Sequence, residues 1–282
     1  MTDQQTLPTT EEQPERQPVP FPAETVTPRP RPRPRLRAAL RWVAAVAVFA
    51  ITGTGTAYGI TLMDRTDVPG LATRSDGRWD YPELVKPPLP SGSPGPVAAA
   101  NKAGAHYADL RALVLPAPHG ATPDPALKGD DGWVTTKDFL APYTEASRSA
   151  LRQKLVDYGL RHVAARGWTT PDGTRTRVYL LQFDTAAVAE DLLNKDLVSY
   201  SGPRFPLTGA ASFNQEDDFV GPTVKGVTPV YFTEVKPYGK EQLRMAYLGA
   251  GDTIAMITQS RKGVARAVPF WQTLTLQSEL LG

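Results

Sequence analysis

One long apolar run divides the chain into two unequal parts. Residues 42–63 (WVAAVAVFAITGTGTAYGITLM) are 22 residues without a charged side chain. That length is close to the ~20 residues with which an α-helix crosses the hydrocarbon core of a bilayer. A helix also satisfies its backbone polar groups internally, as lipid requires. The run therefore predicts a transmembrane helix over residues 42–63.

A cleaved signal peptide and a buried helix of a soluble protein are the alternatives. A signal peptide has a short basic start, an apolar core of ~7 to 15 residues and a small-residue cleavage site. Here the leader before the run has 41 residues, and Ala57-Tyr58-Gly59 fits a cleavage site poorly. No Arg-Arg pair precedes the run, so a twin-arginine export signal is not indicated. The run also lacks a polar face. The sequence favours an uncleaved membrane anchor.

Beyond residue 106 the apolar positions recur at the spacings of short helices and strands. Spacings of three and four predict a helix over 145–158. The segments 160–168 and 175–183 flank a Pro-Asp-Gly turn, which predicts a β-hairpin. A second helix is predicted over about 186–197. The middle of the chain therefore reads as helix, hairpin, helix.

The last third of the chain predicts an antiparallel meander and a closing helix. Pro-Tyr-Gly and Gly-Asp separate its strands, and tight connections of this kind join antiparallel neighbours. The predicted elements are strands over 230–235, 242–249 and 253–259 and a helix over 267–281. We therefore expect a globular domain over 106–282 of the α+β class, with a mainly antiparallel sheet and helices on one face.

Two segments lack the apolar content of a folded element. Residues 1–41 are rich in Pro, Gln, Thr, Glu and Arg, so they cannot bury enough surface to offset the entropy of ordering. Residues 64–105 include a Pro-rich stretch that reads as a semi-rigid stalk. Trp79, Tyr81 and Leu84 are unusual in a pure spacer, which suggests that part of the stalk packs on the domain.

Arginine residues give the predicted membrane helix a direction. Arg35, Arg37 and Arg41 immediately precede the apolar run, whereas Asp64 and Arg65 follow it. Basic residues are enriched on the cytoplasmic side of membrane helices. We therefore expect a single-pass protein of the cell membrane, with a cytoplasmic N-terminus and an extracytoplasmic C-terminal domain.

The same basic tail has two interpretations. It either contacts anionic inner-leaflet lipid, at about 1 kcal/mol per arginine near the surface, or merely fixes the topology. The arginines concerned are Arg29, Arg31, Arg33, Arg35, Arg37 and Arg41. The bilayer is the expected partner in both cases.

A pair of glycines within the run bears on self-association. Gly55 and Gly59 form a G-x-x-x-G pattern, which lets two membrane helices approach closely. Small residues are also common in membrane helices without any such contact. A homodimer through these glycines is therefore one hypothesis, and ordinary composition is the other.

Charge and cysteine content narrow the classes of function. Seven of the 31 basic and five of the 29 acidic residues lie in residues 1–41, which leaves 24 of each beyond it. A neutral outer part carries no electrostatic footprint for nucleic acid and does not indicate an acidic substrate. The chain has no cysteine, which excludes disulfides, thiolate metal sites and a lipidated cysteine.

Catalytic and metal-binding motifs are not apparent in the sequence. No G-x-S-x-G, S-x-x-K, P-loop or H-E-x-x-H pattern occurs. Of the three histidines, His162 lies within a predicted strand, where we expect a partly buried structural residue. His119 lies in a Pro-rich loop and His106 at the domain edge. We expect no cofactor and no metal site.

Two acidic clusters are the remaining candidates for chemistry. Asp130 and Asp131 form one, and Glu216 and Asp217 belong to the other. Neither follows the calcium-binding loop pattern, so solvated turns are the favoured interpretation. The alternative is an envelope hydrolase that uses paired carboxylates, which would require a cleft joining these acids.

A resemblance covers most of residues 77–282. The stretches GRWDYPELVKPPLPSGSP, HYADLRALVLPAPHGA, RHVAARGWTTPDGTRTRVYLLQF and PFWQTLTLQSELL resemble uncharacterised membrane-anchored proteins of high-GC actinobacteria, notably streptomycetes. That group implies no activity and no site residues. The order of elements is also similar to extracytoplasmic sensor domains of actinobacterial receptor kinases, in architecture only.

The expected function is that of a binding or interaction domain at the cell surface. It would recognise an envelope component, a small ligand or another membrane protein. The alternatives are the envelope hydrolase and an accessory subunit of a membrane signalling complex, assembled through Gly55 and Gly59.

Overall fold

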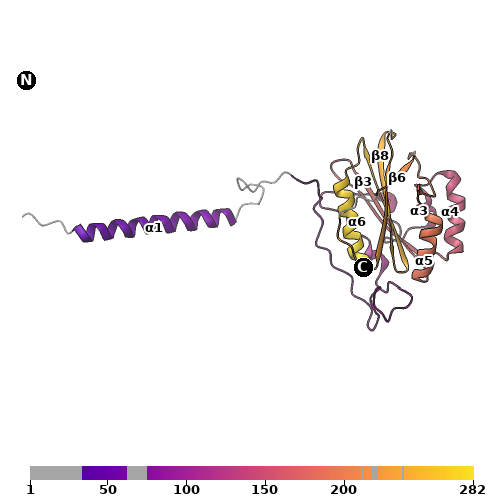
Figure 1. Ribbon diagram of the computed structural model, residues 1–282, viewed down its shortest axis with the longest axis horizontal. Helices are drawn as coiled ribbons and strands as arrows, with labels where there is room; N and C mark the ends of the chain where they lie inside the picture. Colours follow the sequence, from indigo (N-terminus) through magenta and orange to yellow (C-terminus); the bar gives the residue numbers. More distant parts are fainter. Residues whose placement is uncertain (1–33, 62–74, 211, 217–220, 237) are drawn as a thin grey trace, which may run out of the picture. The chain divides into compact units, whose positions relative to one another are not determined.

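The computed structural model describes residues 34–61, 75–210, 212–216, 221–236 and 238–282. Contacts divide the chain into two compact units, Met1–Thr73 and Arg74–Gly282. In its described part the first unit is a single helix, and all other described elements belong to the second unit (Figure 1).

The helix of the first unit is α1 (Pro34–Thr61). Its segment Arg37–Gly59 is long and apolar enough to cross a membrane, and none of it is buried. One candidate membrane helix thus precedes a folded domain. The helix begins before Trp42, so the prediction of a disordered tail up to residue 41 is wrong for residues 34–41. Strong helix formers at Ala38, Ala39 and Leu40 explain the earlier start. The remaining tail, residues 1–33, lies outside the described residues.

The second unit is built on a seven-stranded sheet with the order β1-β2-β3-β9-β8-β7-β6. Every neighbouring pair is antiparallel, which confirms the predicted α+β class. Its strands are β1 (Thr122–Pro123), β2 (His162–Thr169), β3 (Arg175–Gln182), β6 (Phe213–Gln215), β7 (Val227–Glu234), β8 (Glu241–Ala250) and β9 (Thr253–Lys262). A separate small ribbon pairs β4 (Val198–Ser199) with β5 (Gly202–Pro203).

Two predicted units of local structure meet at the centre of the sheet. The hairpin β2–β3 and the meander β7–β8–β9 are both present as expected, with slightly different ends. They join because β3 pairs with β9, in a register that runs from Arg175 opposite Ser260 to Gln182 opposite Thr253. This pairing places residues from distant parts of the chain side by side.

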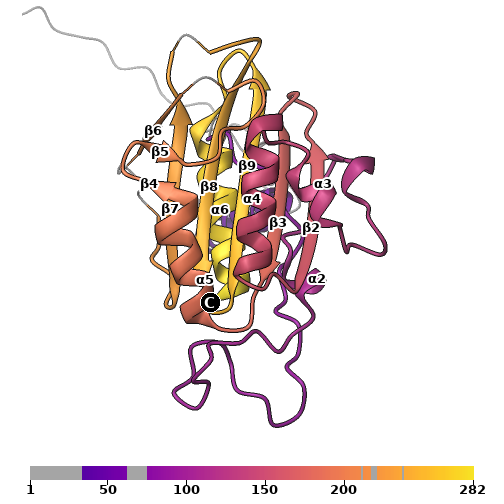
Figure 2. The ribbon, with the colours of Figure 1, turned by 90° about the vertical axis from the view of Figure 1, so that its right-hand side faces the viewer.

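Helices lie on both faces of this sheet, as Figures 1 and 2 show. Helices α4 and α5 pack on one face and α6 on the other. The helical elements of this unit are α2 (Leu110–Leu113), the 3₁₀ turn η1 (Pro125–Leu127), α3 (Thr136–Leu140), α4 (Glu145–Asp157), α5 (Ala186–Leu192), the π-helical turn η2 (Leu193–Leu197) and α6 (Ala267–Leu281).

The prediction of helices on one face is therefore wrong. Along β3, Tyr179 and Leu181 pack in the core under α4 and α5, whereas Val178 and Leu180 pack in the core under α6. A strand that is apolar at consecutive positions has both faces buried. The run Val178-Tyr179-Leu180-Leu181 carried this signal.

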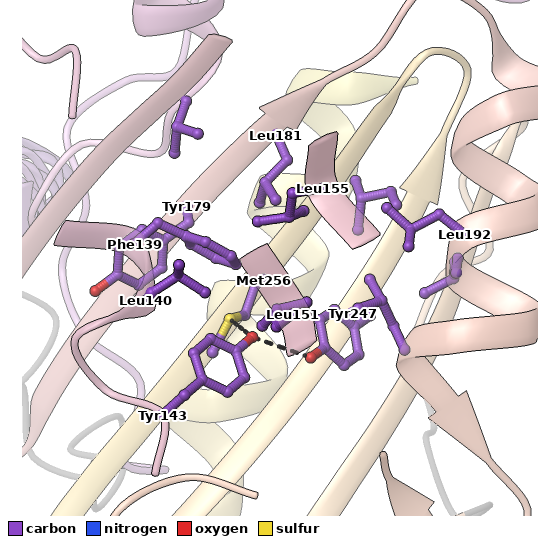
Figure 3. Packing of buried hydrophobic residues seen from close by; sticks show 14 of the residues in the cluster. Phe139, Leu140, Tyr143, Leu151, Leu155, Tyr179, Leu181, Leu192, Tyr247 and Met256 are labelled. Carbon is purple, nitrogen blue, oxygen red and sulfur yellow. Dashed lines mark hydrogen bonds between the residues drawn. The ribbon is translucent and has the colours of Figure 1, made fainter. Parts of the chain in front are cut away.

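The core on the side of α4 contains a buried pair of tyrosines. The hydroxyls of Tyr143 and Tyr247 lie 3.2 Å apart, and that of Tyr143 also contacts the sulfur of Met256 at 3.0 Å (Figure 3). Burial, and for Tyr143 the neighbouring Tyr247, raises the pKa of both phenols well above the usual value, so both stay neutral. Leu151 and Leu155 of α4 complete this layer.

The segment before residue 106 packs on the domain. The backbone of Trp79 forms two hydrogen bonds of 2.8 Å with the side-chain amide of Gln272 on α6. Tyr81 bonds Thr273 through its hydroxyl at 3.1 Å and packs edge-on against Trp168. We call residues 75–105 the strap. The compact unit thus begins at Arg74, and the predicted stalk boundary at residue 106 lies too late, because the few aromatic residues of the strap anchor a segment whose overall composition is that of a linker.

Candidate functional site

A cleft lies at the end of the sheet where β3 and β8 begin and β9 ends. Its volume is about 500 Å³. Strand residues form its floor, and the loops around residues 207–210 and 239–240 form its sides. The lining residues are Pro142, Arg175, Arg177, Leu207, Thr208, Gly209, Ala210, Gly239, Lys240, Glu241, Leu243, Thr258 and Ser260. This volume lies within the range of small-molecule sites.

The floor of the cleft continues the face that carries the core under α4. Side chains two apart on a strand lie on the same face, so Arg175 and Arg177 extend the row of Tyr179 and Leu181. Arg175 lies opposite Ser260, and Arg177 opposite Thr258. On β3 and β9 the next two levels of this face therefore present polar side chains, whereas β8 stays apolar there with Met245 and Leu243.

One wall of the cleft is held by backbone pairing. Tyr143 and Leu207 form an isolated antiparallel bridge. Next to it, the backbone N–H of Thr208 donates to the carbonyl of Pro142 at 2.8 Å, and the Thr208 hydroxyl donates to the carbonyl of Tyr143 at 3.1 Å. Because Tyr143 is fully buried, this wall is fixed to the core.

The charges that line the cleft are mostly positive. Arg177 is paired with Asp124, whose carboxylate lies 2.8 Å from one guanidinium nitrogen. Arg175 and Lys240 form no ion pair with any residue that the structure describes, and neither does the one acidic lining residue, Glu241. The lining therefore has two cations free to meet a ligand.

Tyr179, one level below Arg177, provides no base. Burial raises the pKa of its phenol to about 12, although the charge of Arg177 acts in the opposite direction. The phenol is neutral at neutral pH. The cleft thus offers charge, hydroxyl groups and apolar wall, and this arrangement is suited to binding.

A second cavity, of about 460 Å³, lies beside the first predicted acidic cluster. Here Arg111 bonds both Asp109 and Asp131, each at 2.6 Å, and Arg166 donates to the carbonyl of Val114 at 2.8 Å. Hydrogen bonds from Arg111 hold the pKa of Asp109 below its usual range. Both arginines of this cavity are already satisfied by the protein.

The structure does not bring the two acidic clusters together. Asp130 and Asp131 lie beside Trp133, which bridges to Ala164 of β2. Glu216 follows β6 at the opposite end of the strand order and is bonded to Arg244 at 3.1 Å. Five strand spacings separate β2 from β6, or roughly 24 Å, whereas paired catalytic carboxylates need about 5 to 10 Å. Asp217 lies outside the described residues.

His106 was expected at the domain edge, but its ring is buried. Its Nδ1 lies 2.7 Å from the Asp252 carboxylate, and its Nε2 lies 2.9 Å from the carbonyl oxygen of Leu281. Both side chains are at most 3% exposed. A histidine hydrogen-bonded to an aspartate is also found in catalytic dyads. Here, however, the second ring nitrogen is hydrogen-bonded to a backbone carbonyl and is not available to a substrate. Its role is to join the strap, the β8–β9 turn and the end of α6.

The other two histidines are exposed. His162 packs beside Trp133, with ring centroids 5.1 Å apart, so the expectation of a partly buried residue is wrong. Its strand lies near the sheet edge, where only short elements cover it. No group of three metal-ligating side chains occurs within the described residues.

The predicted membrane contacts lie on α1 where they are described. Gly55 and Gly59 have open space around them, and Arg35, Arg37 and Arg41 are exposed on the first turns. The hydroxyls of Thr52 and Thr56 donate to carbonyls of the same helix at 2.7 Å, which leaves the glycine face without an unsatisfied polar group. Arg29, Arg31 and Arg33 lie outside the described residues.

Sequence analysis missed the cleft residues. Arg175 and Lys240 are distant in the chain and line one cleft because β9 pairs with β3 on one side and with β8 on the other. One local signal was available: Arg175 and Arg177 share a strand face with the apolar Tyr179 and Leu181. Charge at the end of an otherwise buried strand face indicates where the covering helices stop.

Comparison with known proteins gives little further information. No protein-family model matches the chain, and no curated protein matches it in sequence. Among solved structures, it is similar to the extracellular domain of PknH from Mycobacterium tuberculosis, with a TM-score of 0.31 and 8% identity over 45% of this chain and 68% of that chain. Values this low do not establish a shared fold or function.

Proposed function

We propose that this protein is a membrane-anchored, extracytoplasmic binding domain whose ligand occupies the cleft at the end of β3, β8 and β9. The cleft carries the proposal, because it combines a volume of about 500 Å³ with free polar groups on a rigid floor. The candidate membrane helix supports the anchoring. The ligand is an envelope component, a small molecule or a segment of another membrane protein.

The proposed orientation has the N-terminus in the cytoplasm. Arg35, Arg37 and Arg41 lie on the N-terminal turns of α1, and basic residues favour the cytoplasmic side. In this orientation they, together with Arg29, Arg31 and Arg33, contact the anionic inner leaflet.

The binding proposal is tested on residues 74–282, which form one compact unit with their own core on each face of the sheet. The purified domain is screened by thermal unfolding against soluble cell-wall fragments and metabolites. A ligand that prefers the native state increases the free energy of unfolding, by about 2.7 kcal/mol at a ligand concentration of 100 Kd, and therefore raises the melting temperature.

A blocked cleft makes this test specific. Ser260→Trp fills the half-exposed floor of the cleft, whereas Val156→Trp alters an exposed position on α4. We expect Ser260→Trp to abolish the ligand-induced rise and Val156→Trp to retain it. A ligand that stabilises both variants equally, or a saturable hydrolytic activity in the wild-type domain, would contradict the proposal.

We also propose that α1 associates with a second copy through Gly55 and Gly59. The support is the open glycine face beside hydroxyls that are satisfied within the helix. Energy transfer between labelled full-length chains in vesicles is expected to fall in Gly55→Ile and to persist in Gly53→Ile, which lies on another part of the helix surface. Equal transfer in both variants would rule out this contact.

The alternative of an envelope hydrolase with paired acids receives no support from the fold. Asp130 and Asp131 lie at one edge of the sheet and Glu216 at the other. Asp131 and Glu216 are each held by an arginine.

A further inference from the structure

Arg175 in the cleft differs from the two arginines of the second cavity. In the second cavity, Arg111 and Arg166 are bonded to carboxylates or a backbone carbonyl. In the cleft, Arg175 and Lys240 have no such partner among the described residues, although they face the same enclosed space. An unpaired cation that lines a cleft can form a charge-assisted hydrogen bond with an anionic ligand.

The strand geometry groups the donors of the cleft closely. Arg175 and Arg177 lie about 7 Å apart along β3, and Ser260 and Thr258 lie beside them, one strand spacing or about 5 Å away. Neither hydroxyl is hydrogen-bonded to another residue that the structure describes. One group with several acceptor oxygens can therefore meet a guanidinium and a hydroxyl at the same time.

Apolar side chains form the rest of the enclosure. Pro142, Leu207, Ala210 and Leu243 also line the cleft, and the last three belong to or pack against the core under α4. Burial of a ligand's hydrocarbon against them removes apolar surface from water and so stabilises the complex. The lining is thus amphipathic, with charge and apolar wall in one site.

We propose that the cleft recognises an amphiphilic anion, a ligand with a carboxylate or phosphate group attached to a short apolar body. Arg175 and Lys240 bind the anionic group, the hydroxyls of Thr258 and Ser260 donate to its oxygens, and the apolar wall covers its body. This inference rests on the proposed function and adds the chemical class of the ligand. Glu241 lies within the same lining and disfavours a large, multiply charged anion.

The probes for this proposal share one hydrocarbon chain. Hexyl phosphate, heptanoate and hexan-1-ol all carry a hexyl chain and differ only in the head group, and each is titrated into ¹⁵N-labelled residues 74–282 while amide shifts are followed. We expect the two anions, and not the alcohol, to shift the amides of Arg175, Lys240 and Ser260 saturably. The tighter of the two anions then shows whether a phosphate or a carboxylate is the natural head group.

The variants Arg175→Gln and Lys240→Gln test the named contacts. Both positions are exposed and unpaired among the described residues, so the amide spectrum is expected to stay native. Each change should weaken anion binding about tenfold, the size expected for one charge-assisted hydrogen bond. Arg152→Gln, an exposed change on α4, is the matched control and should have no effect.

Two results would overturn the inference. Hexan-1-ol binding the cleft as tightly as the anions would leave a binding cleft but remove the anion preference, so the proposed function would survive. Anion shifts that avoid the cleft, or that are unchanged in Arg175→Gln and Lys240→Gln, would also exclude it. The proposed function is tested separately, by the thermal-unfolding screen. It fails if the ligands found there stabilise Ser260→Trp as much as the wild-type domain.

Discussion

At the scale of single residues, His106 connects three parts of the chain that are remote in sequence. Its Nδ1 contacts Asp252 in the β8–β9 turn, and its Nε2 contacts the carbonyl of Leu281 at the end of α6. Because a carbonyl oxygen can only accept, Nε2 is the donor in the second bond. Gln182, Thr253 and the backbone N–H of His106 also donate to the Asp252 carboxylate. Removing the ring would leave this carboxylate buried without its main partner.

We therefore expect His106→Ala to lower the free energy of unfolding by about 3 kcal/mol, because a buried charged group loses its partner. Urea unfolding of residues 74–282 measures this difference. His119→Ala is the matched control, since that side chain is exposed, and should change stability by less than about 0.5 kcal/mol. Similar losses in both variants would show that the His106 contact contributes nothing special.

Thr176 presents the opposite case, a buried hydroxyl without a hydrogen-bond partner among the described residues. Replacing an unsatisfied buried hydroxyl by a methyl group of the same shape removes a desolvation penalty. Thr176→Val is expected to keep or raise stability, by up to about 1 kcal/mol. Val178→Thr, on the same face of β3, should lower it. Calorimetry of both variants checks the sign, and a marked loss in Thr176→Val would contradict the expectation.

The site residues could be predicted only in part. Cysteine chemistry could be excluded from composition alone, because the absence of cysteine does not depend on which residues come into contact in the fold. Arg175 and Lys240 could not be assigned to one cleft in advance, since that depends on the pairing of β9 with both β3 and β8. His106 was misplaced because its partners, Asp252 and Leu281, lie far away in sequence, and only long-range contacts bury it.

At the scale of elements, the β2–β3 hairpin depends on one carboxylate in its turn. Burial by itself raises the pKa of Asp172, but hydrogen bonds from Thr170 and Thr174 and the charge of Arg261 outweigh it, so the pKa of this carboxyl lies below its usual range. The hydroxyl of Thr170 donates to Asp172 at 2.6 Å. A carboxyl with a depressed folded pKa stabilises the fold above its unfolded pKa and loses this contribution as the pH falls through the folded value.

Acid should therefore weaken this turn. We expect the stability that the domain loses between pH 6 and pH 3 to be smaller in Asp172→Asn than in the wild type, since the variant lacks the titrating group. Asp109 and Asp196 also have lowered pKa values and are present in both proteins, so both proteins still lose some stability in acid. Urea unfolding at the two pH values provides the comparison. An unchanged loss would place the acid sensitivity in other carboxylates.

The strap behaves as part of the fold and can be tested by truncation. Residues 106–282 lack Tyr81 and Leu84, which cover the core beside Trp168 and α6. We expect this fragment to be several kcal/mol less stable than residues 74–282, because apolar core surface becomes exposed. Tyr81→Phe in the longer fragment should lower stability by about 1 kcal/mol, the size of one hydrogen bond. Equal melting temperatures of the two fragments would restore the stalk interpretation.

Most elements were predictable because their signals are local. The hairpin and α4 each carry their own turn or periodicity, and both formed where expected. The sequence analysis did not predict helices on both faces of the sheet. The only local signal for them is the short apolar run in β3, which polar residues flank on both sides. Trp79 and Tyr81 correctly indicated that part of this segment packs on the domain, but the linker composition around them placed the domain boundary too late.

At the scale of the whole molecule, the chain combines one candidate membrane helix with one two-sided domain. Because the chain has no cysteine, single cysteines report its orientation without background. We expect a membrane-impermeant maleimide to label Ser91→Cys in intact cells, and Thr9→Cys only after permeabilisation. The reverse pattern would place the domain in the cytoplasm.

The attachment of the strap also determines how the domain would respond to a pull on its N-terminal end. The chain enters at Trp79, whose two hydrogen bonds with Gln272 act as a clasp on the side of α6. Tension applied to residue 75 would load these side-chain bonds and the Tyr81 contact before it reached any strand pair of the sheet. The strap would then detach while the sheet stayed intact. Under force the domain would therefore unfold in a fixed order, with the strap contacts breaking before the strand pairs.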